Sequence, residues 1–377
     1  MSQDSLKQRA TGLLAQAGID INGEAPCDLR VHDERLYARV FAHGSLGLGE
    51  AYMDGWWDAA DLPGLFTRLL EAELDQELRT LDTVLAHLKA RFINLQRGEH
   101  AFEIGRAHYD LGNDLFQAML GQRLVYSCGY WDRADNLDDA QAAKLDLICR
   151  KLRLKPGQRV LDIGCGWGEA LKYAAEHYGV EGIGITVSSE QAAWARELCA
   201  GLPVEIRLQD YHELDEPFDA IMSIGMFEHV GPLNYRRYFE VARRCLRDDG
   251  ADGGGLFLLH CIGSNSEPAR PDPWIEKYIF PKSVIPAASQ VAAAMEGLFV
   301  MEDWHNFGAD YERTLRAWQA NFDAAWPVLS RGYDERFRRM WHYYLAASTA
   351  VFRTRRDQLW QITLSPHGVP GGYRVPR

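Results

Sequence analysis

The sequence predicts an α/β protein in which a doubly wound sheet domain follows a smaller helical domain. Three observations lead to this prediction. The chain has 377 residues, which is long for one ordinary core and suits two domains. The first hundred residues carry apolar stripes at helical spacing. From residue 155 onward, short apolar runs alternate with amphipathic helical patterns. We therefore expect a helical domain over residues 1–100 and a second domain over residues 101–377.

The helical pattern of the N-terminal region is clearest in two apolar stripes. Asp61, two residues before Pro63, is expected to begin a further helix in the same region. Stripes of this kind usually form a helical core, although together with Trp56 and Trp57 they could engage a bilayer surface. The stripes are Leu6, Ala10, Leu13, Leu14 and Ala17, and Leu78, Leu81, Leu85, Leu88, Phe92 and Leu95.

Five short apolar runs beyond residue 155 are expected to form strands. Helical patterns separate them, which predicts a doubly wound sheet with ligand sites at the carboxyl ends of its strands. The acidic, glycine-rich stretch 248–255 is expected to form a flexible loop before the fifth strand. The expected strands cover residues 159–163, 182–187, 204–208, 218–224 and 256–260.

Composition and charge narrow the class of protein. The net charge of -12 argues against a broad nucleic-acid surface, because phosphate binding needs clustered Lys and Arg. No apolar run approaches the roughly 20 residues that span a bilayer, and the first residues lack the layout of a signal peptide. Seven scattered cysteines fit a reducing compartment better than a disulfide framework. We expect a cytoplasmic protein.

A glycine-rich segment, DIGCGWG over residues 162–168, follows the first expected strand and precedes a helix. Gly164, Gly166 and Gly168 leave bare backbone that a nucleotide ligand can approach. A lone glycine turn is weak evidence, and a dinucleotide fingerprint is the rival interpretation. Here the spacing is G-x-G-x-G, and Asp162 lies two residues before the first glycine. The segment therefore resembles the S-adenosylmethionine loop of the Rossmann-like methyltransferases.

Polar residues after the next two strands are candidates for the rest of that cofactor site. Thr186 ends the second strand, and Gln191 follows where many methyltransferases place an acidic residue for the ribose hydroxyls, which Thr and Gln can also bind. Asp210 and Tyr211 follow the third strand, where they could bind the adenine amino group and stack on the ring. Their order along the chain favours the cofactor interpretation over an ordinary turn.

Four stretches, 126–131, 226–231, 260–263 and 307–312, combine polar residues with apolar or glycine neighbours in a way that the fold does not require. Glu228 follows the fourth expected strand and His260 ends the fifth, where ligands of open sheets bind. Each residue also has a structural interpretation. Cys128 and Tyr311 taken alone are more often buried packing residues, and Glu228 and His260 fit either role equally well.

Four longer motifs favour the functional interpretation of these residues. They are GSLGLGE at 44–50, YMDGWW at 52–57, HYDLGND at 108–114 and DWHNFG at 303–308. In content and order they resemble the bacterial cyclopropane-fatty-acyl-phospholipid synthases, nearly from end to end. The resemblance implies an enzyme that transfers a methylene from S-adenosylmethionine to the cis double bond of unsaturated phospholipid acyl chains. It also implies a homodimer that associates transiently with the inner face of the membrane through its helical domain.

The resemblance further implies two sets of site residues. Tyr126 and Ser127 join the glycine loop as cofactor contacts. The resemblance also implies a bound bicarbonate ion, and no metal is expected. The bicarbonate is held by Cys128, Glu228, His260, the backbone near Ile262, and Tyr311.

The reaction requires a base that does not form a covalent bond with the carbocation. Methyl transfer to an alkene leaves a carbocation, which a fixed carboxylate could capture as an ester, so a small, loosely held oxyanion suits the deprotonation. Either protonation of His260 or a proton shared with Glu228 must relieve the repulsion between bicarbonate and Glu228. A methyl-branched product is the alternative outcome of the same cation. Aromatic candidates for stabilising the cation are Tyr130, Trp131, Phe227 and Tyr278.

Three departures from the family pattern stand out. Glu169 replaces an expected glycine after Gly168, and as a first helical residue it is expected to be exposed, with its charge near the cofactor's carboxylate. The loop at 250–255 is longer than usual. Ser348 stands where some relatives have a cysteine, and no cysteine follows Cys261, which excludes a C-terminal cysteine nucleophile.

Overall fold

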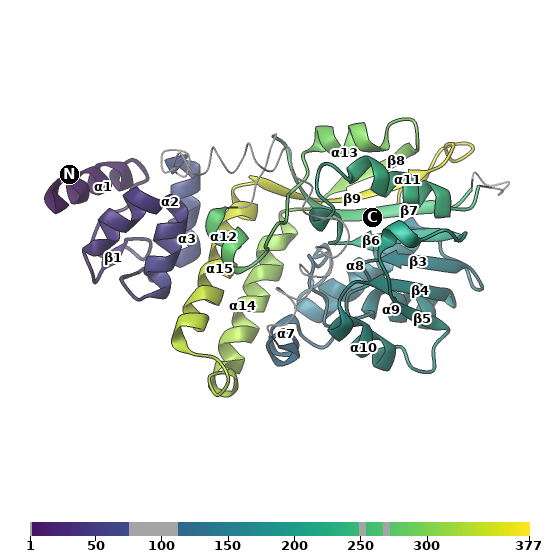
Figure 1. Cartoon of the computed structure of the whole chain (residues 1–377), viewed down its shortest axis with the longest axis horizontal. Helices are drawn as coiled ribbons and strands as arrows, with labels where there is room; N and C mark the ends of the chain where they lie inside the picture. The colour runs from purple at the N-terminus through teal and green to yellow at the C-terminus, as the bar shows by residue number, and fades with distance from the viewer. Residues whose placement is uncertain (1, 75–111, 249–253, 267–271) are drawn as a thin grey trace. The chain divides into compact units, whose positions relative to one another are not determined.

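The computed structural model describes residues 2–74, 112–248, 254–266 and 272–377 (Figure 1). The contacts divide the chain into two compact units. Unit 1 combines residues 1–93 with 271–281 and 315–356, and unit 2 combines 94–270 with 282–314 and 357–377. Unit 1 therefore draws on two later segments as well as on the start of the chain. The predicted boundary at residue 100, the stripe at 78–95 and the middle of the 248–255 loop lie outside the described residues.

Unit 2 is built on a sheet with the strand order β5-β4-β3-β6-β7-β9-β8. Neighbours among β3 to β7 pair in parallel, and β9 is antiparallel to both β7 and β8. From β3 the chain moves outward to β4 and β5, then returns to β6 on the other side of β3, which creates a switch point for ligands. The strands are β3 (Arg159–Ile163), β4 (Glu181–Thr186), β5 (Val204–Leu208), β6 (Ala220–Ile224), β7 (Leu256–Ser264), β8 (Val300–Asn306) and β9 (Asp357–Ser365).

Helices cover both faces of this sheet, as Figure 1 shows. Leu161 and Phe257 belong to the core shared with α11 and α13, whereas Val160 and Leu258 belong to the core shared with α8, α9 and α10. Since side chains of a strand alternate between faces, the sheet is buried on both sides and the predicted doubly wound fold is confirmed. The helices of unit 2 include α7 (Asn113–Leu120), α8 (Leu137–Lys151), α9 (Glu169–Tyr178), α10 (Ser189–Leu198), α11 (Tyr235–Cys245) and α13 (Ala288–Met295).

The two C-terminal strands of the sheet were not among the five predicted. In β8, Val300 and Met301 are exposed and are followed by Glu302 and Asp303, so the strand lacks the apolar run that marks a buried strand. Strand β9 lies between β7 and β8 although it is the last in the chain. Its place depends on long-range pairing, which local patterns do not report.

Unit 1 is mainly helical. Helix α3 begins after Asp61, whose side chain accepts a hydrogen bond from Gly64 N at 2.9 Å, as the Asp61–Pro63 pattern predicts. Helix α15 packs against α2 and α3, so removing the N-terminal residues would uncover α15. The elements are α1 (Gln3–Gln16), β1 (Arg30–Val31), α2 (Arg35–Met53), β2 (Trp57–Asp58), α3 (Leu62–Glu71), α12 (Pro273–Tyr278), α15 (Glu335–Arg353), and α14 (Asp310–Leu329) from residue 315 onward.

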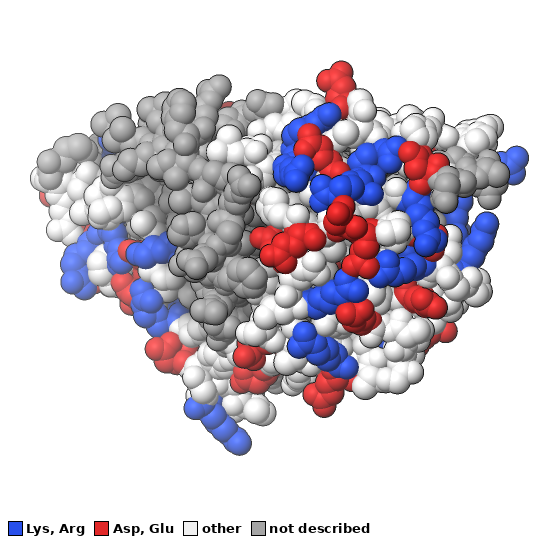
Figure 2. All heavy atoms as spheres, turned by 45° about the vertical axis from the view of Figure 1, so that its right-hand side comes forward, with Lys and Arg blue, Asp and Glu red and all other residues white. Residues whose placement is uncertain are grey.

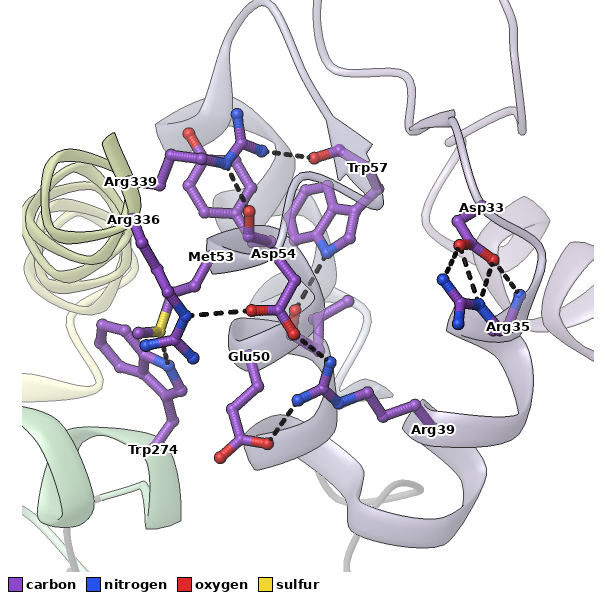
Figure 3. A network of polar contacts seen from close by, with 12 residues as sticks. Asp33, Arg35, Arg39, Glu50, Met53, Asp54, Trp57, Trp274, Arg336 and Arg339 are labelled. Atoms are coloured by element: carbon purple, nitrogen blue, oxygen red, sulfur yellow. Dashed lines mark hydrogen bonds and ion pairs between the residues drawn. The ribbon is translucent and has the colours of Figure 1, made fainter. Parts of the chain in front are cut away.

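The Trp56-Trp57 pair differs from the expectation that both residues could meet a bilayer. Trp57 is fully buried, and its Nε1 donates a hydrogen bond to Leu48 O at 2.9 Å (Figure 3). Trp56 is half-buried, and the guanidinium groups of Arg35 and Arg39 lie over its ring at 4.7 and 4.8 Å from the centroid. Trp57 is thus a core residue of unit 1. The stripe on α1 is half-buried and includes no fully buried residue.

We expect Trp57→Ala to lower the free energy of unfolding by about 3–5 kcal/mol, because truncating a buried aromatic leaves a cavity. Trp56→Ala, the neighbouring control, should lower it by less than about 1 kcal/mol. Urea unfolding followed by circular dichroism checks both values. A Trp57→Ala protein with normal stability but weaker vesicle binding would contradict the core assignment.

Charged groups are mixed on the molecular surface. On the face drawn in Figure 2, Lys and Arg side chains alternate with Asp and Glu. Ion pairs such as Arg207 with Glu205 at 2.8 Å and Arg247 with Asp219 at 2.5 Å are part of this pattern in unit 2. Within the described ranges, no helix is both long enough and apolar enough to cross a membrane.

Candidate active site

The glycine-rich turn after β3 exposes bare backbone. The N–H groups of Gly164 and Cys165 both donate to Ile185 O, at 3.0 and 2.9 Å, which ties the turn to β4. Gly164, Gly166 and Gly168 have φ values of 87°, 54° and 92°, in the region that favours glycine. A Cβ added at Gly166 would meet nothing within 4 Å. The backbone at Gly166 therefore faces open space that a ligand can enter.

This turn forms one wall of a cavity of about 190 Å³ at the carboxyl ends of β3, β4, β5 and β6. Gly168 is the one predicted cofactor residue that does not line the cavity. A Cβ there would instead lie 3.0 Å from Ala195 Cβ of α10, so Gly168 serves close helix packing. The predicted residues that do line the cavity are Tyr126, Ser127, Asp162, Gly164, Gly166, Thr186, Gln191, Asp210 and Tyr211.

Asp162 is the acidic group of the cavity wall. It is 1% exposed, and its Oδ1 has no hydrogen-bond partner among the described residues. Burial raises the pKa of this carboxyl to about 7, and the nearby charge of Lys144 opposes the rise. A buried acceptor without a partner is costly. The arrangement suits a ligand that brings a donor, such as an amino group.

Polar side chains also follow β4 and β5. Thr186 Oγ1 donates to Gln191 Oε1 at 3.0 Å, which orients the glutamine in the cavity wall. Asp210 Oδ1 accepts from His212 N at 3.0 Å. The Tyr211 ring packs at 5.3 Å against the ring of Tyr238, so one side of it belongs to the core. The 3₁₀-helix η1 (Tyr211–Glu213) holds this segment just beyond the carboxyl end of β5.

Glu169 differs from the exposed residue that its place at the start of α9 suggests. It is 7% exposed, lines the cavity, and accepts a hydrogen bond from Arg123 Nη1 at 2.8 Å. Burial raises the pKa of its carboxyl, and Arg123 acts in the opposite direction. The segment before α8 thus covers Glu169 and supplies the cation that offsets its charge, an arrangement that helix position alone does not report.

Glu228 and Ile262 lie together beyond the end of β6. Strand β6 ends at Ile224 while β7 continues to Ser264, so Ile262 N is beyond the reach of the ladder with β6. Glu228, in η2 (Phe227–His229), accepts from Ile262 N at 2.7 Å through Oε1. Its Oε2 is buried without a partner among the described residues, and burial raises the pKa of the carboxyl to about 7. Glu228 therefore holds a proton more readily than an exposed glutamate.

His260 lies two residues before Ile262, on the same strand and the same side. Gln361 Nε2 of β9 donates to its Nδ1 at 3.4 Å, which places the ring proton on Nε2. Nε2 is buried and has no partner in the described chain. Burial lowers the pKa of His260 well below its usual value, so the ring is neutral. A neutral His260 with a free Nε2–H is a hydrogen-bond donor.

Cys128 and Tyr311 lie near the start of α14. Cys128 is fully buried, and Thr314 Oγ1, one helical turn after Tyr311, donates to its Sγ at 3.8 Å. Burial raises the pKa of the Cys128 thiol well above its usual value, so it is uncharged. Tyr311 is buried in the first turn of α14. The ring of His260 is 5.9 Å from that of Phe307, which precedes the same helix.

The aromatic candidates have different surroundings. The Tyr130 ring contacts Phe307 edge-on at 5.4 Å. Arg313 already lies 4.5 Å from the face of Trp131, and Phe227 stacks on Tyr235 in the core. Tyr278 belongs to unit 1, where its hydroxyl donates to Glu50 at 2.9 Å. Tyr130 is thus the candidate linked through Phe307 to His260.

Sequence reasoning missed two buried polar residues of α8. Gln141 Nε2 donates to Ser127 O at 2.8 Å, and Lys144 Nζ donates to Ser127 Oγ at 2.9 Å. Their i, i+3 spacing places both on one helix face, where they hold the segment that carries Tyr126 and Ser127. The available signal was a lysine on the apolar side of an amphipathic helix.

A model of the mycolic acid cyclopropane synthetase family matches residues 96–362, which is more than half of the chain. The chain belongs to this family. The resemblance inferred from the sequence motifs is thereby confirmed. The chain is 52% identical to the cyclopropane-fatty-acyl-phospholipid synthase of Escherichia coli K12, across 99% of this chain and 97% of that protein. It is 35% identical to a probable fatty acid methyltransferase of Pseudomonas putida, across 71% of this chain and 70% of that protein.

A solved member of the cyclopropane synthase family has the same fold. The mycolic acid cyclopropane synthase CmaA1, in a complex with SAH and CTAB, superposes with a TM-score of 0.63 at 32% identity. The superposition covers 70% of this chain and 98% of that protein. The Rossmann-like methyltransferase fold predicted from the glycine loop is therefore confirmed.

Proposed function

We propose that this chain is a cyclopropane-fatty-acyl-phospholipid synthase, which uses S-adenosylmethionine to convert the cis double bond of an unsaturated phospholipid acyl chain into a cyclopropane ring. The observation that carries the proposal is the 52% identity, over 99% of the chain, to the Escherichia coli enzyme of that name. The open backbone at Gly166 and the unpartnered Asp162 Oδ1 support the cofactor assignment.

The cavity residues account for the first step. Bound S-adenosylmethionine supplies an electrophilic methyl group. The glycine turn, Thr186, Gln191, Asp210 and Tyr211 would hold it, together with Tyr126 and Ser127. An isolated alkene is a poor nucleophile, so the protein must hold it in line with the methyl group and exclude water. The burial of the residues around Asp162 and Ser127 meets the second requirement.

The second step removes a proton from the newly added methyl group, and we assign it to the group around Glu228. Glu228 Oε2 and His260 Nε2 are buried polar atoms without partners among the described residues, which fits a small oxyanion such as bicarbonate. Neutral His260 donates through Nε2–H, and Glu228, whose pKa is raised to about 7, can share a proton. A shared proton therefore relieves the repulsion better than a charged histidine. Cys128 and Tyr311 complete this proposed set.

A lipid methyltransferase that leaves a methyl branch is the second candidate, supported by the 35% identity to the probable fatty acid methyltransferase. Both candidates keep the same cavity and differ in where the proton is lost. Ring closure is favoured because the identity to the Escherichia coli synthase is 52% over 99% of the chain, against 35% over 71% for the methyltransferase.

The deciding experiment incubates the protein with S-adenosylmethionine and vesicles of a monounsaturated phospholipid, followed by mass spectrometry. We expect a gain of one CH₂ in the acyl chain, and the product should resist ozonolysis because it has no double bond. A product of equal mass that ozone cleaves would identify an alkene that carries a methyl or methylene branch. No change in mass would contradict both candidates.

We also propose that the protein works at the membrane surface as a homodimer. Acyl chains of phospholipids lie in a bilayer, and binding at the membrane surface would bring the enzyme to them. Vesicle flotation tests the association, and sedimentation velocity tests the dimer. A protein that stays monomeric at micromolar concentration would contradict the dimer.

A further inference from the structure

Lys144 is a fully buried cation in the cavity wall. It extends from α8, its side chain is 0% exposed, and its Nζ donates to Ser127 Oγ at 2.9 Å. An ammonium group has three donors, and Ser127 Oγ is the one hydrogen-bond partner of Nζ in the described chain. The other two donors have no acceptor among the described residues.

A second lysine on the same helix shows what a satisfied buried ammonium looks like here. Lys151, seven residues later, is also 0% exposed, but its Nζ lies 3.0 Å from Asp303 Oδ2 and 3.2 Å from His305 Nδ1. Among the described residues, no carboxylate lies within 4.0 Å of Lys144 Nζ. Burying an ammonium without an anion is unfavourable. The position of Lys144 therefore calls for an anion that the described residues do not supply.

The neighbouring acids do not fill this role. Glu169 also lines the cavity but is paired with Arg123 at 2.8 Å. Asp162 lies in the same wall, outside ion-pair distance of Lys144, and its Oδ1 has no partner in the described part of the chain. The cavity wall thus contains a cation, Lys144, and an anion, Asp162, that the described residues each satisfy incompletely.

We propose that Lys144 binds the α-carboxylate of the methionine end of S-adenosylmethionine. The cofactor's methionine end is a zwitterion, and Asp162 and Lys144 offer the two complementary charges. In the free protein, burial lowers the pKa of Lys144 to about 7 and raises that of Asp162 to about 7, so neither charge is stable alone. A bound zwitterion stabilises both. Lys144 thereby becomes a specificity residue for the intact amino-acid end of the cofactor, an assignment that rests on the proposed function.

The test compares two ligands that differ in that carboxylate. Calorimetry at pH 7 measures the binding of S-adenosylhomocysteine (SAH) and of decarboxylated SAH. The wild type should bind SAH more tightly. Lys144→Met should weaken SAH binding by about 10- to 100-fold and change the affinity for decarboxylated SAH by less than about threefold. Lys151→Met is the matched control from the same helix face: it should lower the melting temperature and leave both affinities unchanged.

The outcomes separate this proposal from the proposed function. Equal affinities of the wild type for the two ligands would overturn the role of Lys144, however the variant folds. A folded Lys144→Met protein with wild-type affinity for SAH would overturn it as well. A wild type that binds neither SAH nor S-adenosylmethionine would overturn the proposed function first, and this proposal with it.

Discussion

Gly166→Val should weaken the binding of S-adenosylhomocysteine by roughly 5- to 100-fold. Gly166 has φ of 54°, and a Cβ there would point into the open space of the cavity. A β-branched side chain strongly resists this backbone conformation and would fill space that the cofactor needs. Overpacking typically costs about 1–3 kcal/mol, and each 1.4 kcal/mol is tenfold in affinity. Calorimetry on the purified variant measures the loss.

Gly157→Val is the control for backbone strain alone. Gly157 has φ of 78°, a Cβ there would also meet nothing within 4 Å, and the residue does not line the cavity. The Gly157→Val protein should lose about as much stability as the Gly166→Val protein while keeping its affinity for S-adenosylhomocysteine. If both variants lose affinity equally, backbone strain explains the effect, and the glycine turn is not the cofactor contact.

The fold was predictable where local pattern and topology agree. Strands β3 to β7 are short apolar runs separated by helices, and that alternation leaves a parallel sheet as the simplest arrangement. Strand β8 was missed because exposed Val300 and Met301 and acidic Glu302 hide it. The division of the chain into two units could not be predicted from local patterns either. Unit 1 includes residues 315–356 because α15 packs on α2 and α3.

Some residues of the candidate site could likewise be predicted from the sequence, and others could not. The glycine turn could be read from the sequence because its spacing and the preceding Asp162 follow from what a close backbone approach requires. The role of Lys144 could not be predicted from the sequence, because nothing local distinguishes it from Lys151, a second lysine on the same helix face. Only the tertiary structure shows that one lysine meets Asp303 and the other faces the cavity. Glu169 was misjudged because Arg123, which covers it, lies 46 residues away.

Glu228→Gln should lower turnover by about 10²–10⁴-fold, the usual contribution of a general base, because Glu228 holds the bicarbonate that acts as this base. Cofactor affinity should change little. Glutamine keeps the shape and can still accept the hydrogen bond from Ile262 N, so the backbone contact at 2.7 Å survives. It cannot share a proton as an acid does. Turnover is measured on vesicles with dissolved carbonate removed and then restored, at constant pH and ionic strength. The wild type should slow and recover, and the variant should lose most of that response.

Stability against pH, measured together with turnover, distinguishes this role from a purely structural one. Burial raises the pKa of Glu228 from 4.5 to about 7, so the folded state binds the proton more tightly than the unfolded state does. Its stabilising contribution is complete below pH 4.5 and is lost as the pH rises through 7, by roughly 3 kcal/mol in all. Glu228→Gln should therefore lose less stability than the wild type between pH 5 and pH 8, while Asp162, raised to about 7, contributes equally to both. If that stability difference is present but turnover per folded molecule is normal and independent of carbonate, Glu228 is a buried structural acid and another group removes the proton.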